Sequence, residues 1–151
     1  MSREPFLPML RELARCYQAF EAYSSTHVRS LGLTPSQFDI VATLGNTPGM
    51  SFKELGEKTL ITKGTLTGVI DRLEAQKLVR RSASPEDGRS MIVSLTPAGE
   101  RLFERVFAAH LAHMRLALGG LDAKRLAQIE SALRGLRETF DAACGRKAGA
   151  Q

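Results

Sequence analysis

Residues 51–75 read SFKELGEKTLITKGTLTGVIDRLEA and contain two helix starts on either side of a tight turn. At the first start, Ser51 and Glu54 have the spacing of a capping box, in which each side chain bonds the other residue's backbone. At the second start, Thr62 has the position of an N-cap, and Ile61 and Leu66 flank it as a hydrophobic staple. Two helices joined by so few residues cross steeply, so the segment predicts a helix-turn-helix.

The second helix of this pair, expected from Thr62 to Gln76, has two contrasting faces. Its apolar face predicts core contacts by Leu66, Val69, Ile70 and Leu73. The opposite face carries Gly64 and Gly68, although a glycine inside a helix costs about 1 kcal/mol relative to alanine. A close approach to a DNA edge explains that cost. Hydroxyls and cations for bases and phosphates lie near this face, on Thr62, Lys63, Thr65, Thr67 and Arg72.

Two strand-like runs, residues 78–84 and 91–95, follow this helix on either side of the polar turn cluster 85–90. A helix-turn-helix followed by a hairpin with a basic loop is a winged helix-turn-helix. Its recognition helix fits the major groove of duplex DNA, and its wing reaches the minor groove or the backbone. An isolated hairpin tip is usually only solvated, but beside such a helix the tip is expected to contact DNA. For Arg80 and Arg81, a phosphate contact and a structural role both remain open.

Apolar stripes predict long helices on both sides of this segment. Residues 5–31 carry a stripe at alternating spacings of four and three, made of Phe6, Leu10, Leu13, Tyr17, Phe20, Ser24, His27 and Leu31. Thr34 and Gln37 form a capping box that opens a helix to about Leu44. Thr96 opens another helix to about Leu118, and Asp122 caps the last one. That last helix has the stripe Leu126, Ile129, Leu133, Leu136, Phe140 and Ala143, and a frayed tail is expected over 145–151.

The composition fits a single globular domain. The chain has 151 residues, 43% of them hydrophobic and 25% charged. Its longest apolar run, 106–109, is too short to cross a bilayer, and the first residues lack the apolar stretch of a secretory signal. We therefore expect a cytoplasmic protein. The net charge of +5 fits a polyanionic partner, but the basic excess lies in the C-terminal third and does not locate the binding surface.

Motifs beyond the helix-turn-helix make the resemblance specific. Nearly the whole chain is similar to the MarR family, through residues 51–58, 62–74 and 78–81, the wing motif 87–90 (DGRS) and the segment 93–99 (VSLTPAG). The resemblance implies a bacterial or archaeal homodimeric transcription regulator whose terminal helices form the dimer interface. It also implies that the wing arginine, Arg89, enters the minor groove and that Asp87 helps to hold the wing. Gly68 stands where many relatives carry a larger polar or basic residue.

These observations combine into one prediction of a mainly α (α+β) fold. A single domain, 1–151, is expected to contain a winged helix-turn-helix lobe over 33–95 and a helical dimerisation lobe over 5–31 and 97–144. The predicted function is a dimeric DNA-binding regulator, a repressor that a small-molecule effector releases from a pseudo-palindromic operator. The predicted DNA-binding residues are Ser51, Thr62, Lys63, Gly64, Thr65, Thr67, Gly68, Arg72, Arg80, Asp87 and Arg89.

Ser24 and His27 place polar groups on an otherwise apolar stripe. One interpretation is that the buried stripe simply ends there, with His27 hydrogen-bonded locally. The other is an effector pocket between the two lobes, where members of the similar family bind small, often phenolic, anions. In that pocket the imidazole would bond a carboxylate or phenol, with Tyr23 and Phe38 as apolar walls.

Other chemistry has little support in the sequence. His110 and His113 could share a metal, but no carboxylate or cysteine lies nearby on the same helix, so no metal site is expected. Cys16 and Cys144 are expected to be small buried hydrophobes, although a redox sensor based on Cys16 is an alternative. No catalytic motif or cofactor site is evident, so the chain is not expected to be an enzyme. The remaining alternative is a winged helix used only for protein binding. An apolar or acidic wing and recognition face would favour that alternative, but here both carry cations.

Overall fold

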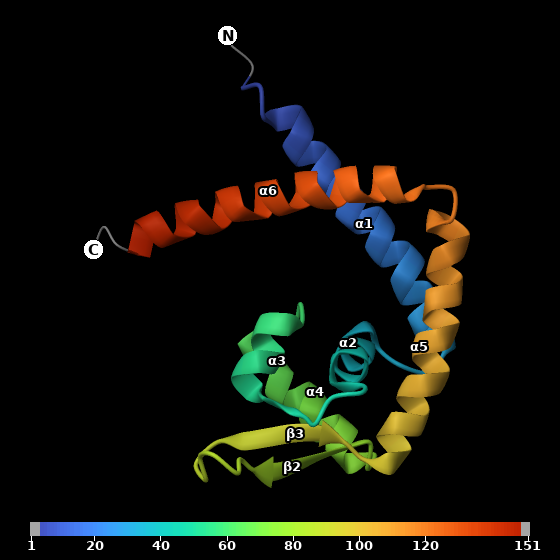
Figure 1. Cartoon of the computed structure of the whole chain (residues 1–151), viewed down its shortest axis with the longest axis vertical. Helices are drawn as coiled ribbons and strands as arrows, with labels where there is room; N and C mark the ends of the chain where they lie inside the picture. Colours follow the sequence, from blue (N-terminus) through green and yellow to red (C-terminus); the bar gives the residue numbers. More distant parts are fainter. Residues whose placement is uncertain (1–3, 149–151) are drawn as a thin grey trace. The chain divides into compact units, whose positions relative to one another are not determined.

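The computed structural model describes residues 4–148, with side chains described up to residue 145, and it confirms the mainly helical fold. Within these residues the helices are α1 (Leu7–Ser30), α2 (Pro35–Leu44), α3 (Phe52–Lys58), α4 (Lys63–Ala75), α5 (Pro97–Leu118) and α6 (Ala123–Ala148). The strands are β1 (Met50–Ser51), β2 (Val79–Ala83) and β3 (Met91–Leu95) (Figure 1). The chain divides into two compact units, Met1–His113 and Met114–Gln151, and α5 runs from the first into the second.

The predicted helix starts are confirmed at three places. Thr34 and Gln37 form a complete capping box, because each side chain bonds the other residue's backbone at 3.1 Å. The Thr96 hydroxyl accepts a hydrogen bond from the Gly99 amide at 3.1 Å. The Asp122 carboxylate accepts one from the Arg125 amide at 2.7 Å. These bonds satisfy amides that would otherwise lack a partner in the first helical turn.

Two other helix starts are built differently from the prediction. The Ser51 hydroxyl accepts a bond from the Glu54 amide, but the structure gives no reciprocal bond from the Glu54 side chain among the described residues. Thr62 occupies the N-cap position of α4, yet its hydroxyl donates to the hydroxyl of Thr65, at 3.1 Å, and caps no backbone amide. Both helices begin at the expected residues, because staple and turn positions also define a helix start.

The structure extends the prediction at two further points. The strand β1, which was not predicted from the sequence, is only two residues long. It pairs antiparallel with β3, so the sheet order is β1-β3-β2. The last helix continues to Ala148, so residues 145–148 are helical and not frayed as expected. The final residues of the predicted tail, 149–151, lie outside the described residues.

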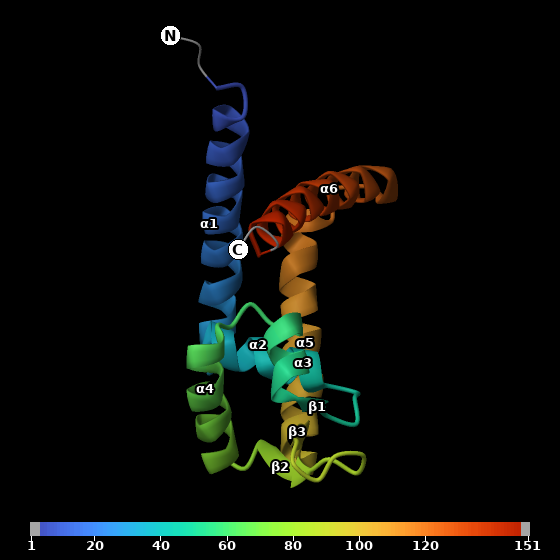
Figure 2. The same cartoon turned by 90° about the vertical axis from the view of Figure 1, so that its left-hand side faces the viewer.

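The core of the first unit fixes the helix-turn-helix against the sheet. In Figure 2, α3 lies above β2 and β3, and the lower end of α4 reaches the level of β2. Fully buried side chains from these elements and from α1, α2 and α5 meet in one cluster that includes Val28, Ile40, Leu44, Leu55, Ile70, Leu73, Val79, Val93 and Val106. The apolar face predicted for α4 is buried as expected, with Leu66, Val69, Ile70 and Leu73 at 4% exposure or less. This packing holds α4 rigidly and leaves its other face free.

The stripes of the terminal helices are largely uncovered within the single chain. At the N-cap of α1 and along the helix, Phe6, Leu13, Tyr17 and Phe20 are between 37% and 51% exposed. On α6, Leu126, Leu133 and Phe140, spaced seven residues apart, are between 43% and 53% exposed. Patches of this kind on a folded chain mark interaction surfaces. None of the described helices is long and apolar enough to span a membrane.

Candidate nucleic-acid interface

The exposed face of α4 is open at both of its glycines. A Cβ added at Gly64 or at Gly68 would meet no atom within 4 Å, so neither glycine is required by packing inside the chain. The predicted contact residues around them, Thr62, Lys63, Thr65, Thr67 and Arg72, are all exposed. A stripe without side chains, bordered by hydroxyls and cations, lets the helix backbone approach a polyanion closely.

Gly99 is a useful contrast within the same unit. A Cβ there would lie 2.1 Å from the Leu78 carbonyl oxygen, so Gly99 is a packing glycine. The clearance at Gly64 and Gly68 shows that these two glycines, unlike Gly99, are not required by packing within the chain. It supports the interpretation that these two glycines serve an external partner.

The turn between α3 and α4 is tied to α2. The Asp39 carboxylate on α2 accepts a hydrogen bond from the Leu60 amide at 2.9 Å. Burial raises the pKa of Asp39, and the bond from Leu60 lowers it in part. This contact fixes the loop that sets the direction in which α4 leaves the turn, although Asp39 gives no sign of this role in the sequence.

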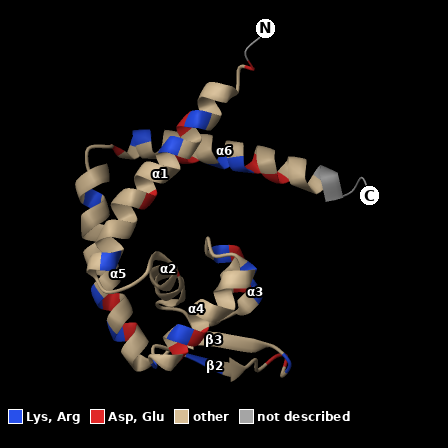
Figure 3. Ribbon diagram, turned by 180° about the vertical axis from the view of Figure 1, so that it is seen from behind, with Lys and Arg blue, Asp and Glu red and all other residues tan. Residues whose placement is uncertain are grey.

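The wing has an ordered tip. The Ser84 hydroxyl accepts bonds from the amides of Glu86 and Asp87, both at 3.3 Å. The Asp87 carboxylate accepts bonds from the Arg89 amide at 3.0 Å and from the Ser90 hydroxyl at 3.1 Å. Asp87 thus holds the loop backbone, which leaves the Arg89 side chain exposed to solvent. Figure 3 shows both charge signs gathered at this turn.

The adjacent arginines of β2 have different environments. Arg80 is exposed, as a phosphate contact requires. Arg81 is partly buried and pairs with the carboxylates of Asp71 and Glu74 on α4. The structure therefore separates two residues that the sequence left equivalent, because side chains alternate between the two faces of a strand.

A second cluster gathers all three histidines of the chain. His27 Nδ1 on α1 lies 3.0 Å from His110 Nδ1 on α5, and His110 Nε2 lies 3.1 Å from the Ser24 hydroxyl. His27 also stacks on His113 with ring centroids 4.1 Å apart. The expectation of a local hydrogen bond for His27 is therefore wrong, and His110 and His113 join a site for which the sequence named only α1 and α2 residues.

Aromatic rings close the histidine cluster on two sides. Tyr23 stacks on His113 at 4.0 Å and donates its hydroxyl proton to the His113 carbonyl oxygen at 2.6 Å. The Phe38 ring on α2 meets the His110 ring edge-on at 4.7 Å. The four residues predicted for the effector site, Tyr23, Ser24, His27 and Phe38, thus all lie around the two α5 histidines.

The electrostatics of this cluster disfavour the protonated forms of His27 and His110. Burial, followed by the charge of His113, lowers the pKa of His27. Burial, followed by the charges of His27 and His113, lowers the pKa of His110. No three metal-binding side chains are arranged to hold an ion among the residues with described side chains. The arrangement suits hydrogen bonding by neutral imidazoles, which can donate from one nitrogen and accept at the other.

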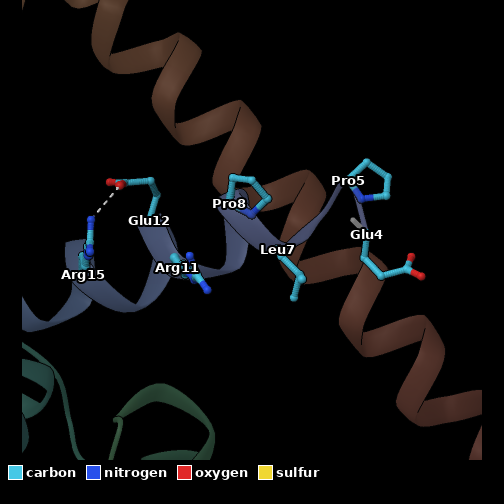
Figure 4. A pocket seen from close by; sticks show the side chains of 7 residues that line it. All are labelled: Glu4, Pro5, Leu7, Pro8, Arg11, Glu12 and Arg15. Atoms are coloured by element: carbon cyan, nitrogen blue, oxygen red, sulfur yellow. Dashed lines mark ion pairs between the residues drawn. The ribbon is translucent and has the colours of Figure 1, made fainter. Parts of the chain in front are cut away.

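Two further features lie outside these sites. A shallow hollow along the start of α1 is lined by Glu4, Pro5, Leu7, Pro8, Arg11, Glu12 and Arg15 (Figure 4). Its ion pair joins exposed side chains, Arg15 and Glu12, at 3.6 Å, and such pairs hold little energy. Cys16 and Cys144 are both exposed free thiols in the chain, contrary to the expectation of buried residues.

A rigidly packed helix-turn-helix with an open glycine face, followed by an ordered wing that exposes Arg89, defines a DNA-binding protein of the winged helix-turn-helix class. Comparison with known proteins agrees. The family model described as "MarR family" matches residues 31–90. The transcriptional regulator MhqR of Bacillus subtilis is 30% identical over 74% of this chain and 77% of its own length. The organic hydroperoxide resistance regulator of the same organism is 35% identical over 73% of this chain and 74% of its own length.

A solved structure extends the agreement to the fold. The DNA-binding protein BpsR of Bordetella bronchiseptica superimposes with a TM-score of 0.77 at 28% identity, covering 91% of this chain and 98% of that one. This chain belongs to the MarR family. It is therefore a DNA-binding regulator of transcription and not an enzyme. Repression that a small molecule relieves, and dimerisation, are properties found in this family.

Proposed function

We propose that the chain is a dimeric repressor that places one α4 in the major groove of each operator half-site. The observation that carries this proposal is the open stripe of Gly64 and Gly68 on a helix whose other face is fully buried. In the complex the two glycines would let the backbone of α4 come close to base edges. Lys63, Arg72 and Arg80 would contact phosphates beside the groove, and Ser51, Thr62, Thr65 and Thr67 would supply hydroxyls.

The wing would act beside the groove that α4 occupies. Asp87 holds the loop through two hydrogen bonds, and Arg89 extends from it into solvent. An arginine on a short ordered loop suits the narrow, electronegative minor groove. A regulator of this kind works on DNA, so its proposed place is the cytoplasm of the cell.

The direct test is competition between two DNA duplexes at several salt concentrations. An operator selected from a random pool should bind about 1,000-fold more tightly than random duplex, or better, at physiological salt. Binding to random duplex should weaken steeply as salt increases, because phosphate contacts release counterions. Equal affinity for both duplexes would mean that α4 does not read sequence.

The histidine cluster is proposed as the effector site. BpsR, the relative with the superimposable structure, is described as regulated in its DNA binding by 6-hydroxynicotinic acid, a small aromatic acid. Here, Ser24, His27 and the two α5 histidines present hydroxyl and imidazole groups between the rings of Tyr23 and Phe38. A small aromatic acid beside these rings would bond the imidazoles through its carboxylate or hydroxyl. It would shift the DNA-binding equilibrium only by its different affinity for the two states.

Titration of salicylate into the protein–operator complex tests this site. We expect operator release at high micromolar to millimolar salicylate, and a weaker response in His27→Ala, with unchanged affinity in the absence of ligand. Thr26→Ala is the matched control, because the exposed Thr26 hydroxyl bonds only its own helix, at the Ala22 carbonyl. No release at any soluble concentration would exclude phenolic acids. Equal release in both variants would place the effector elsewhere.

A redox response through Cys16 is a second candidate function. Its support is the exposure of Cys16 on α1 together with the likeness to the organic hydroperoxide resistance regulator. An exposed thiol is open to oxidation to a sulfenic acid or a disulfide. Under this alternative, an organic hydroperoxide would release the operator from the wild type but not from Cys16→Ser, and Cys144→Ser would respond as the wild type does.

A further inference from the structure

Arg81 joins three elements of the DNA-binding region. The Arg81 guanidinium bonds the Asp71 carboxylate, and its Nε lies 3.7 Å from Glu74 Oε2. Arg81 is on β2, whereas both acids are on α4. The same guanidinium lies 5.5 Å from the centre of the Phe52 ring on α3, within the range of a cation–π contact. The Arg81 side chain is only 25% exposed, so it is held in place and does not extend into solvent.

The two carboxylates that Arg81 contacts lie where they would repel the phosphates of bound DNA. Asp71 follows Gly68 by three residues and shares the open face of α4, and Glu74 lies one turn from Ile70 toward the end of the helix. Their side chains are 57% and 43% exposed. Both would lie within a Debye length, about 8 Å at physiological salt, of phosphates around a helix seated in the groove. Uncompensated, they would repel the DNA backbone.

Within α4 itself, the cations and the anions are equal in number. Lys63 and Arg72 are its cations, and Asp71 and Glu74 are its anions. An arginine in contact with both acids leaves the cations of α4 free to act on phosphates. Arg80, the next residue along β2, is exposed and has no ion pair among the residues with described side chains.

We propose that Arg81 is a positioning residue for DNA binding: it seats α4 on β2 and neutralises Asp71 and Glu74, and it does not itself contact DNA. This inference rests on the proposed placement of α4 in the major groove. It explains why two adjacent arginines occur on β2. One faces outward toward phosphate, and the other faces the helix that must approach phosphate.

A thermodynamic cycle separates this role from the alternatives. Arg81→Gln is made in the wild-type background and in an acid-free background carrying Asp71→Asn and Glu74→Gln, and operator affinity is measured for all four proteins. We expect Arg81→Gln to weaken binding roughly tenfold in the wild-type background, about 1.4 kcal/mol. In the acid-free background its effect should fall below about twofold, because no carboxylate remains to be neutralised.

The matched control is Arg80→Gln, whose loss of affinity should be the same in both backgrounds because Arg80 has no acidic partner to neutralise. If Arg81→Gln loses equal affinity in both backgrounds, Arg81 contacts DNA directly or only supports the fold, and the proposal is wrong. No effect in either background also contradicts it. If thermal melting shows that Arg81→Gln is unfolded, Arg81→Lys is measured in the same two backgrounds and the same comparison decides. Failure of the wild type to bind any operator would instead refute the proposed function itself.

Discussion

His27 Nδ1 and His110 Nδ1 lie 3.0 Å apart, so one ring donates an N–H hydrogen bond to the other and only one of the two nitrogens carries a hydrogen. If both rings were protonated, two N–H groups would face each other and the bond would be lost. The contact joins α1 to α5 across a buried His110. The arrangement is therefore stable only while at least one of the two rings is neutral.

The first prediction concerns pH. The pKa values of His27 and His110 are lowered below 6.5 in the folded chain, chiefly by burial. In acid the unfolded chain therefore binds more protons than the folded one, and the free energy of unfolding should fall as pH drops below about 6.5. Urea unfolding at pH 7.5 and 5.5 measures this decrease.

The double variant His27→Gln/His110→Gln serves as the comparison. It should lose less stability than the wild type between the same two pH values. Asp39, whose pKa is raised, has the opposite sign, but it is present in both proteins and cancels in the difference. Identical pH dependence in the two proteins would show that the histidine pair is not the acid-sensitive element.

The second prediction concerns the wing. Arg89→Ala should weaken operator binding by about 1–3 kcal/mol and reduce its salt dependence by about one phosphate contact. Arg101→Ala is the control, because Arg101 is also an exposed arginine but belongs to α5 and not to the wing loop. Fluorescence anisotropy across salt concentrations compares the two. Equal operator affinities for both variants would show that Arg89 does not contact DNA.

The third prediction concerns the clearance on α4. Gly68→Leu adds a side chain where a Cβ meets nothing within 4 Å, so the chain should keep or raise its melting temperature, since leucine favours a helix by up to about 1 kcal/mol over glycine. Specific operator binding should be lost. Gly99→Ala, in contrast, should lower the melting temperature, because the added Cβ would clash with the Leu78 carbonyl oxygen. A destabilised Gly68→Leu variant would mean that the open face has been assigned wrongly.

The fourth prediction concerns the apolar stripe of α6. Leu133→Asp together with Phe140→Asp places charges on two of its exposed hydrophobic positions, and the dimer should dissociate. Ser131→Asp, on the opposite side of the helix by its spacing, should leave the dimer intact. Sedimentation equilibrium measures the mass of each variant. A stable dimer carrying both apolar-to-acid changes would place the interface on another surface.

The sequence predicted the parts of the fold that local chemistry specifies. Thr34 with Gln37, Thr96 and Asp122 mark helix starts by side-chain bonds to nearby amides, and the apolar spacing of α4 marks its buried face. The strand β1 was missed because two residues carry no alternating pattern, and its existence depends on pairing with β3. Thr62 was assigned a capping bond because its position fits one, but the neighbouring Thr65 hydroxyl offers a competing acceptor.

The sites were predictable only where their residues are close in the sequence. The contact face of α4 and the wing each lie within one short segment. The histidine cluster joins residues more than eighty positions apart, so His110 and His113 could be read only as isolated helix histidines. Arg81 is close in the sequence to its acidic partners, but they lie on another element, so the sequence alone did not show that Arg81 and not Arg80 faces them. The i,i+3 spacing of His110 and His113 was the one available signal, and it indicated only that both face the same side of α5.

The central claim is that this chain recognises a specific DNA sequence through α4. Selection of duplexes from a random pool, followed by sequencing, tests it most directly. The account predicts an enriched inverted repeat whose half-site centres are ~10 bp apart or a small multiple of that distance, and loss of this enrichment in Gly68→Leu. No enriched sequence from the folded wild-type protein, or the same repeat enriched by Gly68→Leu, would contradict it.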